Sequence, residues 1–326
     1  MYNNNKKGLR LLVLLAGLSL AMTGWAVWQE QPVFKIDKLG LLAPELAAQI
    51  GNVTRLEITH GRGMAGSQTL TIDRRESGWV LSERADYPAN QKLVNETLSA
   101  LAGLELVAAR TSSSQWHSSL GLTAPEDLGQ AIRFRMLDAD GTELTSIFLG
   151  KDEKSELDAV QSVRAIGEQQ KNFYVRLESE DKTWLARGRI PRGKETAIWM
   201  DANLSLPSTD QIIAVDFSDI GEGSFNIDDA KGWNDIGFQT WLTAFPTLRA
   251  DDVVSAENID FASAKRIEVK LQSGDIFWLD VVSTSSNFWA RLGSSAGEAG
   301  ETGEVSETSW AYKFDGASKD ILMPDF

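Results

Sequence analysis

The order of hydrophobic and polar positions predicts the same series of elements twice along the chain. Apolar and polar residues alternate with the period of two typical of strands over 53–58 and again over 212–217. Each of these segments opens a predicted hairpin, and Pro88 is expected to stop the first sheet. Apolar residues then recur every three or four positions over 90–102 and 238–245, which predicts one amphipathic helix in each half.

A second pair of strands is predicted after each helix. Asp140-Gly141 and Ser273-Gly274 are dipeptides typical of tight hairpin turns, and alternating segments flank both of them. Strand-like segments rich in aromatic residues follow each hairpin. The predicted strands of this part of the chain are 132–137, 144–149, 173–177 and 184–186 in the first half, and 266–271, 276–281, 288–292 and 310–314 in the second.

The two halves also share short stretches of sequence in the same order. Asn172-Phe173-Tyr174-Val175-Arg176-Leu177 reappears as Asn287-Phe288-Trp289-Ala290-Arg291-Leu292. The other matched blocks are 53–58 with 212–217, 98–101 with 242–245, and 132–137 with 267–272. Because chance does not readily place several blocks in one order, we interpret the halves as two copies of one domain.

These patterns predict an α+β fold in which each copy is an antiparallel sheet covered by a helix. The expected organisation is a basic tip and transmembrane anchor at 1–30, a connector at 31–51, a first repeat domain at 52–200 and a second at 201–326. Within the second copy, 293–309 is rich in Gly, Ser and Glu and has few apolar residues, so we expect an exposed, mobile acidic loop there.

The N-terminal residues predict a single membrane span. Lys6, Lys7 and Arg10 precede an uncharged, mostly apolar run at 11–28, which ends in tryptophans at the far side. Basic residues before the run place the N-terminus in the cytoplasm and the bulk of the chain in the periplasm or otherwise outside. The alternative, a cleaved signal peptide, stays open, although bulky Trp28 makes a poor cleavage context.

Charge and cysteine content exclude several kinds of function. The chain has 46 acidic and 32 basic residues, and its net charge is −14. All the acids and 29 of the basic residues lie beyond Trp28, so that part carries 29 minus 46, or −17. Such a charge disfavours binding to nucleic acid or to anionic lipid. The chain has no cysteine, which excludes thiolate catalysis and thiolate metal sites.

The motifs that could carry chemistry have simpler interpretations. The segment 61–66 has the glycine spacing of a dinucleotide-binding loop, but a strand-like pattern follows where that loop needs a helix, so we expect no cofactor. The two histidines, His60 and His117, have no partner at metal-ligand spacing, so we expect no metal. The acid pairs Asp228-Asp229 and Asp251-Asp252 are interpreted as solvated turns, since adjacent strand residues point to opposite faces.

The repeated aromatic strand is the best candidate for a binding face. A period of two places Phe173, Val175 and Leu177 on one side of the strand. The other side carries the candidate binding residues Tyr174 and Arg176, which correspond to Trp289 and Arg291 in the second copy. We expect each arginine to lie along the aromatic ring two residues before it. The alternative is ordinary packing on a sheet face, and most of the nine tryptophans beyond the anchor are expected to be core residues.

The chain resembles the bacterial membrane-anchored proteins of the domain-of-unknown-function 4340 family. The resemblance rests on the apolar span and on short motifs that extend over nearly the whole chain; they are Leu46-Ala47-Ala48-Gln49-Ile50, Asn52-Val53-Thr54, Gly78-Trp79-Val80-Leu81, Tyr87-Pro88-Ala89, Leu120-Gly121-Leu122, Tyr174-Val175-Arg176, Asp251-Asp252-Val253 and Phe288-Trp289-Ala290-Arg291. The resemblance implies an association with ABC-type export systems of the gliding-motility kind. It implies no catalytic residues.

Three functions remain open on the sequence. The first is a non-catalytic accessory subunit, anchored in the bacterial inner membrane, whose two domains contact the permease or ATPase subunits of an ABC transporter or its cargo. The second is a binding module for envelope polymers such as glycans, which would use exposed tryptophans. The third is an envelope hydrolase, which would need a pair of carboxylates across a cleft.

Overall fold

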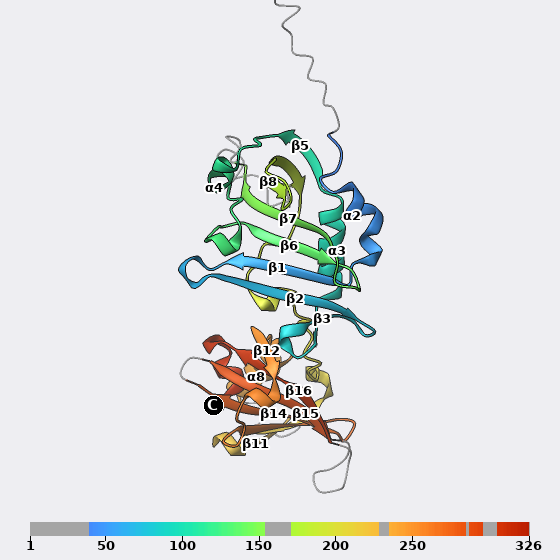
Figure 1. Cartoon of the computed structure of the whole chain (residues 1–326). Helices are drawn as coiled ribbons and strands as arrows, with labels where there is room; N and C mark the ends of the chain where they lie inside the picture. The colour runs from blue at the N-terminus through green and yellow to red at the C-terminus, as the bar shows by residue number, and fades with distance from the viewer. Residues whose placement is uncertain (1–38, 154–170, 228–234, 285–286, 296–304, 326) are drawn as a thin grey trace, which may run out of the picture. The chain divides into compact units, whose positions relative to one another are not determined.

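The computed structural model describes residues 39–153, 171–227, 235–284, 287–295 and 305–325. The predicted span at 11–28 lies outside these residues. No helix in the described part of the chain is long and apolar enough to cross a membrane. Residues from Gly40 onward form one compact unit, and its fold is α+β, with two antiparallel sheets and few helices (Figure 1).

Among the described residues, the first sheet has nine strands in the order β4-β3-β2-β1-β6-β7-β8-β9-β5. Every neighbouring pair in it is antiparallel. The strands are β1 (Arg55–Gly61), β2 (Ser67–Arg75), β3 (Gly78–Leu81), β4 (Tyr87–Pro88), β5 (Glu105–Ala109), β6 (Ile132–Leu137), β7 (Glu143–Asp152), β8 (Lys171–Leu177) and β9 (Trp184–Gly188).

The described part of the second sheet has seven strands in the order β11-β10-β13-β14-β15-β16-β12. Its neighbouring strands are likewise antiparallel. The strands are β10 (Ile212–Asp216), β11 (Ser224–Asn226), β12 (Asp252–Ser255), β13 (Lys265–Leu271), β14 (Ile276–Ser283), β15 (Phe288–Ser295) and β16 (Val305–Phe314).

The two sheets use the same strand order. Without its edge strands β3 and β4, the first sheet reads β2-β1-β6-β7-β8-β9-β5, and each of these strands has its counterpart at the same position of the second sheet. The longest helix of each half also lies at the same point in the series. Helix α3 (Gln91–Ala102) precedes β5, and helix α8 (Ile236–Ala244) precedes β12. All four matched sequence blocks fall on counterpart elements.

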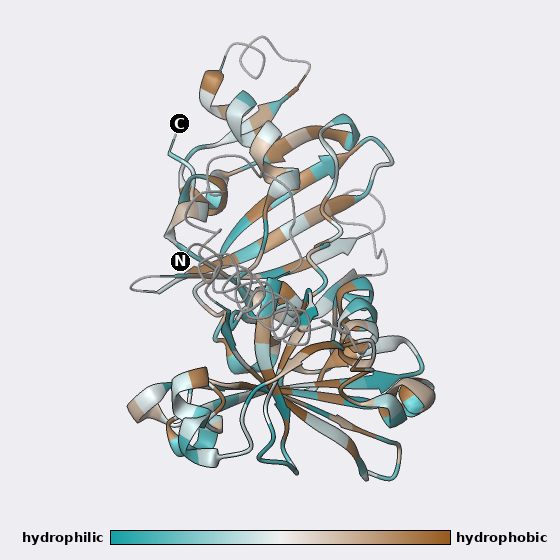
Figure 2. Ribbon diagram, turned by 90° about the horizontal axis from the view of Figure 1, so that it is seen from above, coloured by the Kyte–Doolittle hydropathy of each residue, from teal (hydrophilic) through white to brown (hydrophobic). Residues whose placement is uncertain are grey.

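Each helix begins at a side-chain cap and buries one apolar stripe. The side chain of Asn90 accepts a hydrogen bond from the Leu93 amide, and that of Asp235 accepts one from the Phe238 amide. The stripes bury Val94, Leu98 and Leu101 in α3, and Phe238, Trp241 and Leu242 in α8. They pack on inward-facing strand residues, and Figure 2 shows the alternation of hydrophobic and hydrophilic residues along the strands.

Four smaller helices complete the described fold. They are α2 (Pro44–Gln49), α4 (His117–Leu120), α6 (Thr196–Trp199) and α9 (Lys319–Leu322). Helix α2 contacts α3 and β7, and it buries Leu46, so this part of the predicted connector belongs to the compact unit. Leu39 lies before α2 and is exposed.

Three sequence-based expectations about the strands are corrected. Pro88 does not end the sheet, because Tyr87–Pro88 forms the edge strand β4, where the missing amide of proline is tolerated. The edge strands β5 and β12 were not predicted, and Asp252 belongs to β12 and not to a turn. The expected loop at 293–309 is also too long, since Gly293–Ser295 and Val305–Glu307 pair as strands; residues 296–304 lie outside the described part.

Candidate functional site

The candidate residue Arg176 lies in a row of side chains that crosses the outer face of the first sheet. The row is set by strand register: Arg133 of β6 is opposite Phe148 of β7, which is opposite Arg176 of β8. The inward neighbours of these residues, such as Phe134 and Ile147, belong to the core. The row therefore lies on the face of the sheet that α3 does not cover.

Arg176 is bound by backbone carbonyl groups of its own domain. Its Nε donates to the carbonyl of Leu122 at 3.3 Å, and its Nη1 donates to the carbonyls of Leu177, Glu178 and Glu180 at 3.2, 3.2 and 3.3 Å. The side chain is buried. Burial lowers the pKa of Arg176, although Glu178 and Asp181 act in the opposite direction. The contacts fix the turn after β8 to the sheet.

The ring over which Arg176 lies is not the one expected. Its guanidinium carbon is 4.3 Å from the centre of the Phe148 ring, on the neighbouring strand. Tyr174 is half-buried and packs beside the small apolar group of Leu122, Ala131 and Phe148. Side chains directly across a ladder come closer than those two residues along a strand, which explains why Phe148 replaces Tyr174.

The second sheet carries the counterpart row, in which an acid replaces the phenylalanine. Arg266 of β13 is opposite Asp280 of β14, which is opposite Arg291 of β15. Arg266 binds Asp280 through two hydrogen bonds, at 2.7 Å from Nε to Oδ1 and 3.0 Å from Nη2 to Oδ2. Arg291 Nη2 donates to Asp280 Oδ2 at 2.9 Å. Burial acts to raise the pKa of Asp280, but its bonds to Arg266 and Arg291 outweigh burial and hold the pKa below 3.8.

Aromatic rings surround this second row. The ring of Trp278 covers Gly293 on the next strand, so closely that a Cβ on Gly293 would overlap it. The guanidinium of Arg266 lies 4.8 Å from the centre of the Trp278 ring. Arg291 also pairs with Glu307 at 3.1 Å and lies 5.1 Å from the centre of the Phe261 ring. The partner ring of Arg291 is thus Phe261, and the expected contact with Trp289 is not the one formed.

The four candidate residues therefore have unequal surroundings. Arg176 is buried, whereas Tyr174, Trp289 and Arg291 are half-buried. Both arginines are engaged within their own sheets. Arg266 and Asp280 were not predicted as site residues. Asp280, an acid inside the apolar run of β14, is the signal that could have indicated them. Whether the four residues form a binding face stays a prediction.

A group of polar and aromatic contacts joins the two sheets within the compact unit. Arg84 donates from Nε and Nη2 to the two carboxylate oxygens of Asp252, at 2.6 and 3.2 Å. The ring of Tyr87 makes edge contacts with Trp310 and Tyr312, with ring centres 5.1 and 5.9 Å apart. Trp310 Nε1 donates to the carbonyl of Ala85 at 3.0 Å. We call this group the junction; burial raises the pKa of Tyr312 to about 12.

The glycine-rich segment, the histidines and the acid pairs were given simpler interpretations from the sequence. Their positions in the structure are as follows. Residues 61–66 include the short helical turn Gly63–Ala65 between β1 and β2, at a hairpin tip. His117 is buried, and its Nε2 lies 3.0 Å from the carbonyl oxygen of Asp181. Asp228-Asp229 lies outside the described residues. Within the described part of the chain, no group of three or more histidine, aspartate and glutamate side chains is placed to hold a metal ion.

The tryptophans differ in exposure. Trp79, Trp199, Trp241 and Trp278 are buried, while Trp184, Trp289 and Trp310 are half-buried. Trp116 is 54% exposed. Trp233 lies outside the described residues. A polymer-binding platform would therefore have few exposed tryptophan rings to use among the described residues.

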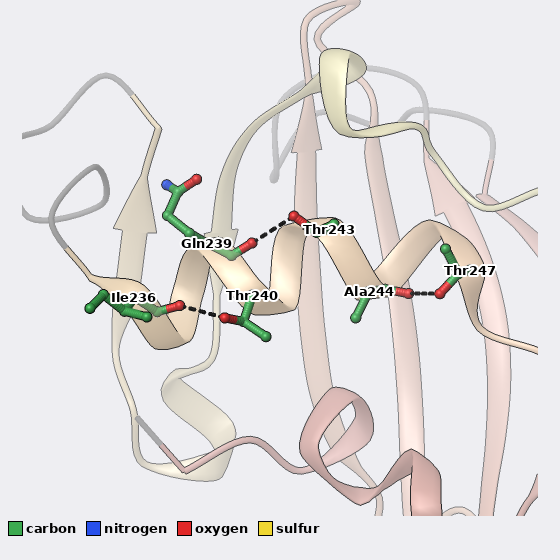
Figure 3. Close-up of a pocket in the computed structure, with 6 residues that line it drawn as sticks. All are labelled: Ile236, Gln239, Thr240, Thr243, Ala244 and Thr247. Carbon is green, nitrogen blue, oxygen red and sulfur yellow. Dashed lines mark hydrogen bonds between the residues drawn. The ribbon is translucent and has the colours of Figure 1, made fainter.

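Helix α8 presents an uncharged outer face. A shallow hollow of about 630 Å³ there is lined by Ile236, Gln239, Thr240, Thr243, Ala244 and Thr247 (Figure 3). Three threonine hydroxyls donate to backbone carbonyls of the same segment, at 2.7–3.0 Å. Their hydrogens are thus already used, and Ile236, which is 83% exposed, gives the hollow an apolar end.

Comparison with known proteins gives one match. The model of a family described as "Domain of unknown function (DUF4340)" matches residues 79–268. The matched segment begins in β3 and ends in β13, and it contains both Arg84 and Asp252 of the junction. No curated protein and no solved structure matches the chain significantly.

Proposed function

The chain belongs to the family of unknown function DUF4340, and from that premise we propose that it is a non-enzymatic accessory subunit of an ABC-type export system. Its two sheets would be copies of one domain and would contact the permease, the ATPase or the cargo from outside the inner membrane. The observation that carries the proposal is the repeated strand order together with the junction. Two related faces joined in one unit suit a protein that holds partners.

The proposed tether is the uncharged run at 11–28, with the N-terminus in the cytoplasm. Its support is the sequence alone, in which three basic residues precede the run and the first basic residue after it is Lys35. We expect the protein to stay in the membrane fraction after alkaline carbonate washing and to be digested by protease added to spheroplasts. Release by carbonate, or protection from protease, would contradict the tether or its orientation.

The proposed contact surface includes the half-buried aromatics of the repeated strand, Tyr174 and Trp289. Aromatic rings that are partly accessible on a fixed sheet supply contact area at low entropic cost, and such residues often dominate binding. Arg291 neighbours Trp289 along β15 and is partly exposed, so it can add charge to the contact. Arg176 would act indirectly, because it fixes the turn after β8.

The experiment is a pull-down of the tagged full-length protein from its own host in mild detergent, followed by mass spectrometry. We expect recovery of an ABC permease and its ATPase. Replacing residues 1–30 by an unrelated anchor or changing the outer sheet faces should reduce that recovery. Recovery of the protein alone, or with cell-wall fragments, would contradict the proposal.

Matched tryptophan variants test the surface. Trp289→Ala should reduce recovery of the transporter subunits, whereas Trp116→Ala, which changes a more exposed tryptophan of the first domain, should leave it unchanged. Both proteins should be compared by thermal unfolding first. Equal recovery of the transporter subunits with both variants would show that Trp289 is not part of the contact surface.

A further inference from the structure

A pocket lies in the first domain, on the inward side of the β1–β2 hairpin, away from the rows and the hollow over α8. Its volume is about 390 Å³, and it is lined by Ile58, His60, Gly61, Arg62, Gln68, Leu70, Lys194 and Thr196. One wall comes from the paired strands, where Ile58 is opposite Leu70 and His60 is opposite Gln68. The other wall comes from the segment that leads into α6.

His60 is the most informative residue of this pocket. The residue is only 7% exposed, and its Nδ1, which is itself buried, has no hydrogen-bond partner among the described residues. Buried polar atoms in folded proteins are nearly always paired, because leaving one unpaired forfeits its hydration. His60 therefore brings a polar ring, whose Nδ1 has no protein partner, to a pocket wall, where a bound polar group can interact with the imidazole.

The charges around the pocket define that partner. Arg62 and Lys194 are exposed cations on its wall. Burial lowers the pKa of His60, Lys194 lowers it further, and Glu195 acts in the opposite direction. The two cations less this one acid leave a single positive charge beside a neutral imidazole, in a chain whose net charge is −14. Such a site favours an anion carrying one charge.

The pocket has a polar part and an apolar part, which suit the polar head and the hydrocarbon tail of one small ligand. The neutral imidazole can donate from one of its two ring nitrogens. Arg84 Nη2 lies 3.4 Å from the Thr196 hydroxyl oxygen, and the hydroxyl hydrogen remains available to donate. Gln68 adds an amide. Ile58 and Leu70 offer only hydrocarbon, which suits an aliphatic chain.

We propose that this pocket binds a small aliphatic monocarboxylate, with its carboxylate near His60, Arg62 and Lys194 and its chain against Ile58 and Leu70. Binding neutralises the local excess of positive charge and gives the imidazole of His60 a polar neighbour. A phosphate dianion fits less well, because it exceeds the single positive charge and has no apolar part. The inference does not depend on a membrane tether or on a transporter partner.

The test uses the fact that the chain has two histidines, His60 and His117. Full-length protein labelled with histidine that carries ¹³C at Cε1 should give one ring signal from each histidine, and sodium hexanoate is titrated in at constant ionic strength and pH 7. We expect the His60 signal to move and saturate. The His117 signal should stay in place, because that ring already bonds to the carbonyl of Asp181.

Surface variants identify the site without disturbing the core. Lys194→Glu and Arg62→Glu should each weaken hexanoate binding about tenfold or more, as expected when a charge-assisted contact is reversed. Lys92→Glu, on the exposed side of α3, is the matched control and should bind as the parent does. Sodium phosphate is the comparison ligand and should bind much more weakly.

Three results would overturn the proposal. The first is a His60 signal that does not respond to hexanoate. The second is a response that survives both charge reversals. The third is phosphate binding as tight as that of hexanoate, since it would show a site for any bare anion and no use of the apolar wall.

Discussion

Asp280 is an acid in the middle of an apolar strand, and two arginines on the neighbouring strands hold it there. Its side chain is 9% exposed, while those of Arg266 and Arg291 are 37% and 27% exposed. A buried charge is tolerated only where partners replace its hydration. In the first sheet the same place is taken by Phe148, and its arginine, Arg176, is satisfied by backbone carbonyls. The repeat therefore keeps the arginines and changes the residue between them.

The first prediction concerns the charge of Asp280. Asp280→Asn should lower the free energy of unfolding by about 2 kcal/mol at pH 7, because it leaves two partly buried guanidinium groups without their anion. Asp320→Asn, at an exposed position, is the control and should change little. Urea denaturation measures both, and an equal effect of the two changes would contradict the account.

The pH dependence of stability follows from the same carboxylate. Because the pKa of Asp280 in the folded protein lies below 3.8, its contribution is present above about pH 4 and is lost as pH falls through the lower folded value. The difference in stability between the parent protein and Asp280→Asn should therefore shrink as the pH is lowered from 5 to 3. A difference that stays constant over this range would contradict the assignment.

Gly293 provides a second prediction at this scale. Gly293→Ala should destabilise the protein by roughly 2 kcal/mol or more, because the new methyl group meets the Trp278 ring and forces it aside. The variant Trp278→Ala removes that obstacle. The double variant should therefore be more stable than the sum of the two single losses predicts, and simple additivity would contradict the contact.

At the scale of elements, the position of α3 depends on one glutamine. Gln91 Oε1 accepts from the Trp79 amide at 2.7 Å, and its Nε2 donates to the carbonyls of Trp79 and Ala89 at 2.7 and 2.8 Å. Trp79 Nε1 also donates to Asn95 on the same helix, at 3.0 Å. The first turn of α3 is thus attached to strand β3 by side chains.

We expect Gln91→Ala to cost about 1–2 kcal/mol of stability, since it leaves backbone groups of β3 and its neighbour without their partners. Lys92→Ala, one residue along the helix, should cost less than about 0.5 kcal/mol because its ion pair with Glu96 is exposed. Thermal unfolding of the two variants measures the difference. Similar unfolding temperatures for the two variants would show that Gln91 does not attach α3 to β3.

Most strands and both long helices could be predicted from the sequence, because alternation and helical spacing are local signals. The edge strands β5 and β12 could not, since both are short and neither alternates clearly between apolar and polar residues. The residues that lie opposite one another on neighbouring strands could not be predicted either. The block match aligned Ile132 with Ile267, whereas the ladders align Phe134 with Ile267, and a shift of two residues keeps the same faces while changing every neighbour.

In the whole molecule, the junction joins the two sheets into one compact unit. The contacts of Arg84 with Asp252 and of Tyr87 with Trp310 join segments that are far apart in the sequence. The ion pair is partly buried, with 20% and 27% of its side chains exposed. Domains joined by such contacts unfold together when the contacts outweigh the difference between their separate stabilities.

The junction leads to a calorimetric prediction. The parent protein should unfold in one transition, because the buried residues of both sheets form one cluster. The double variant Arg84→Ala, Tyr87→Ala should unfold in two, because it removes the ion pair and the ring that link the sheets. Arg187→Ala, at an exposed position of β9, is the control and should keep the single transition. A single transition in the double variant would show that the junction does not couple the sheets.

Photocrosslinking in living cells of the host tests the proposed contact between the outer sheet faces and a transporter. A benzophenone amino acid would replace Trp289 in one strain and Trp116 in another, in the full-length protein at its native level. We expect a crosslink to a subunit of an ABC transporter from position 289 and none from position 116. Crosslinks from position 116 alone, or the absence of a transporter subunit from both, would contradict it.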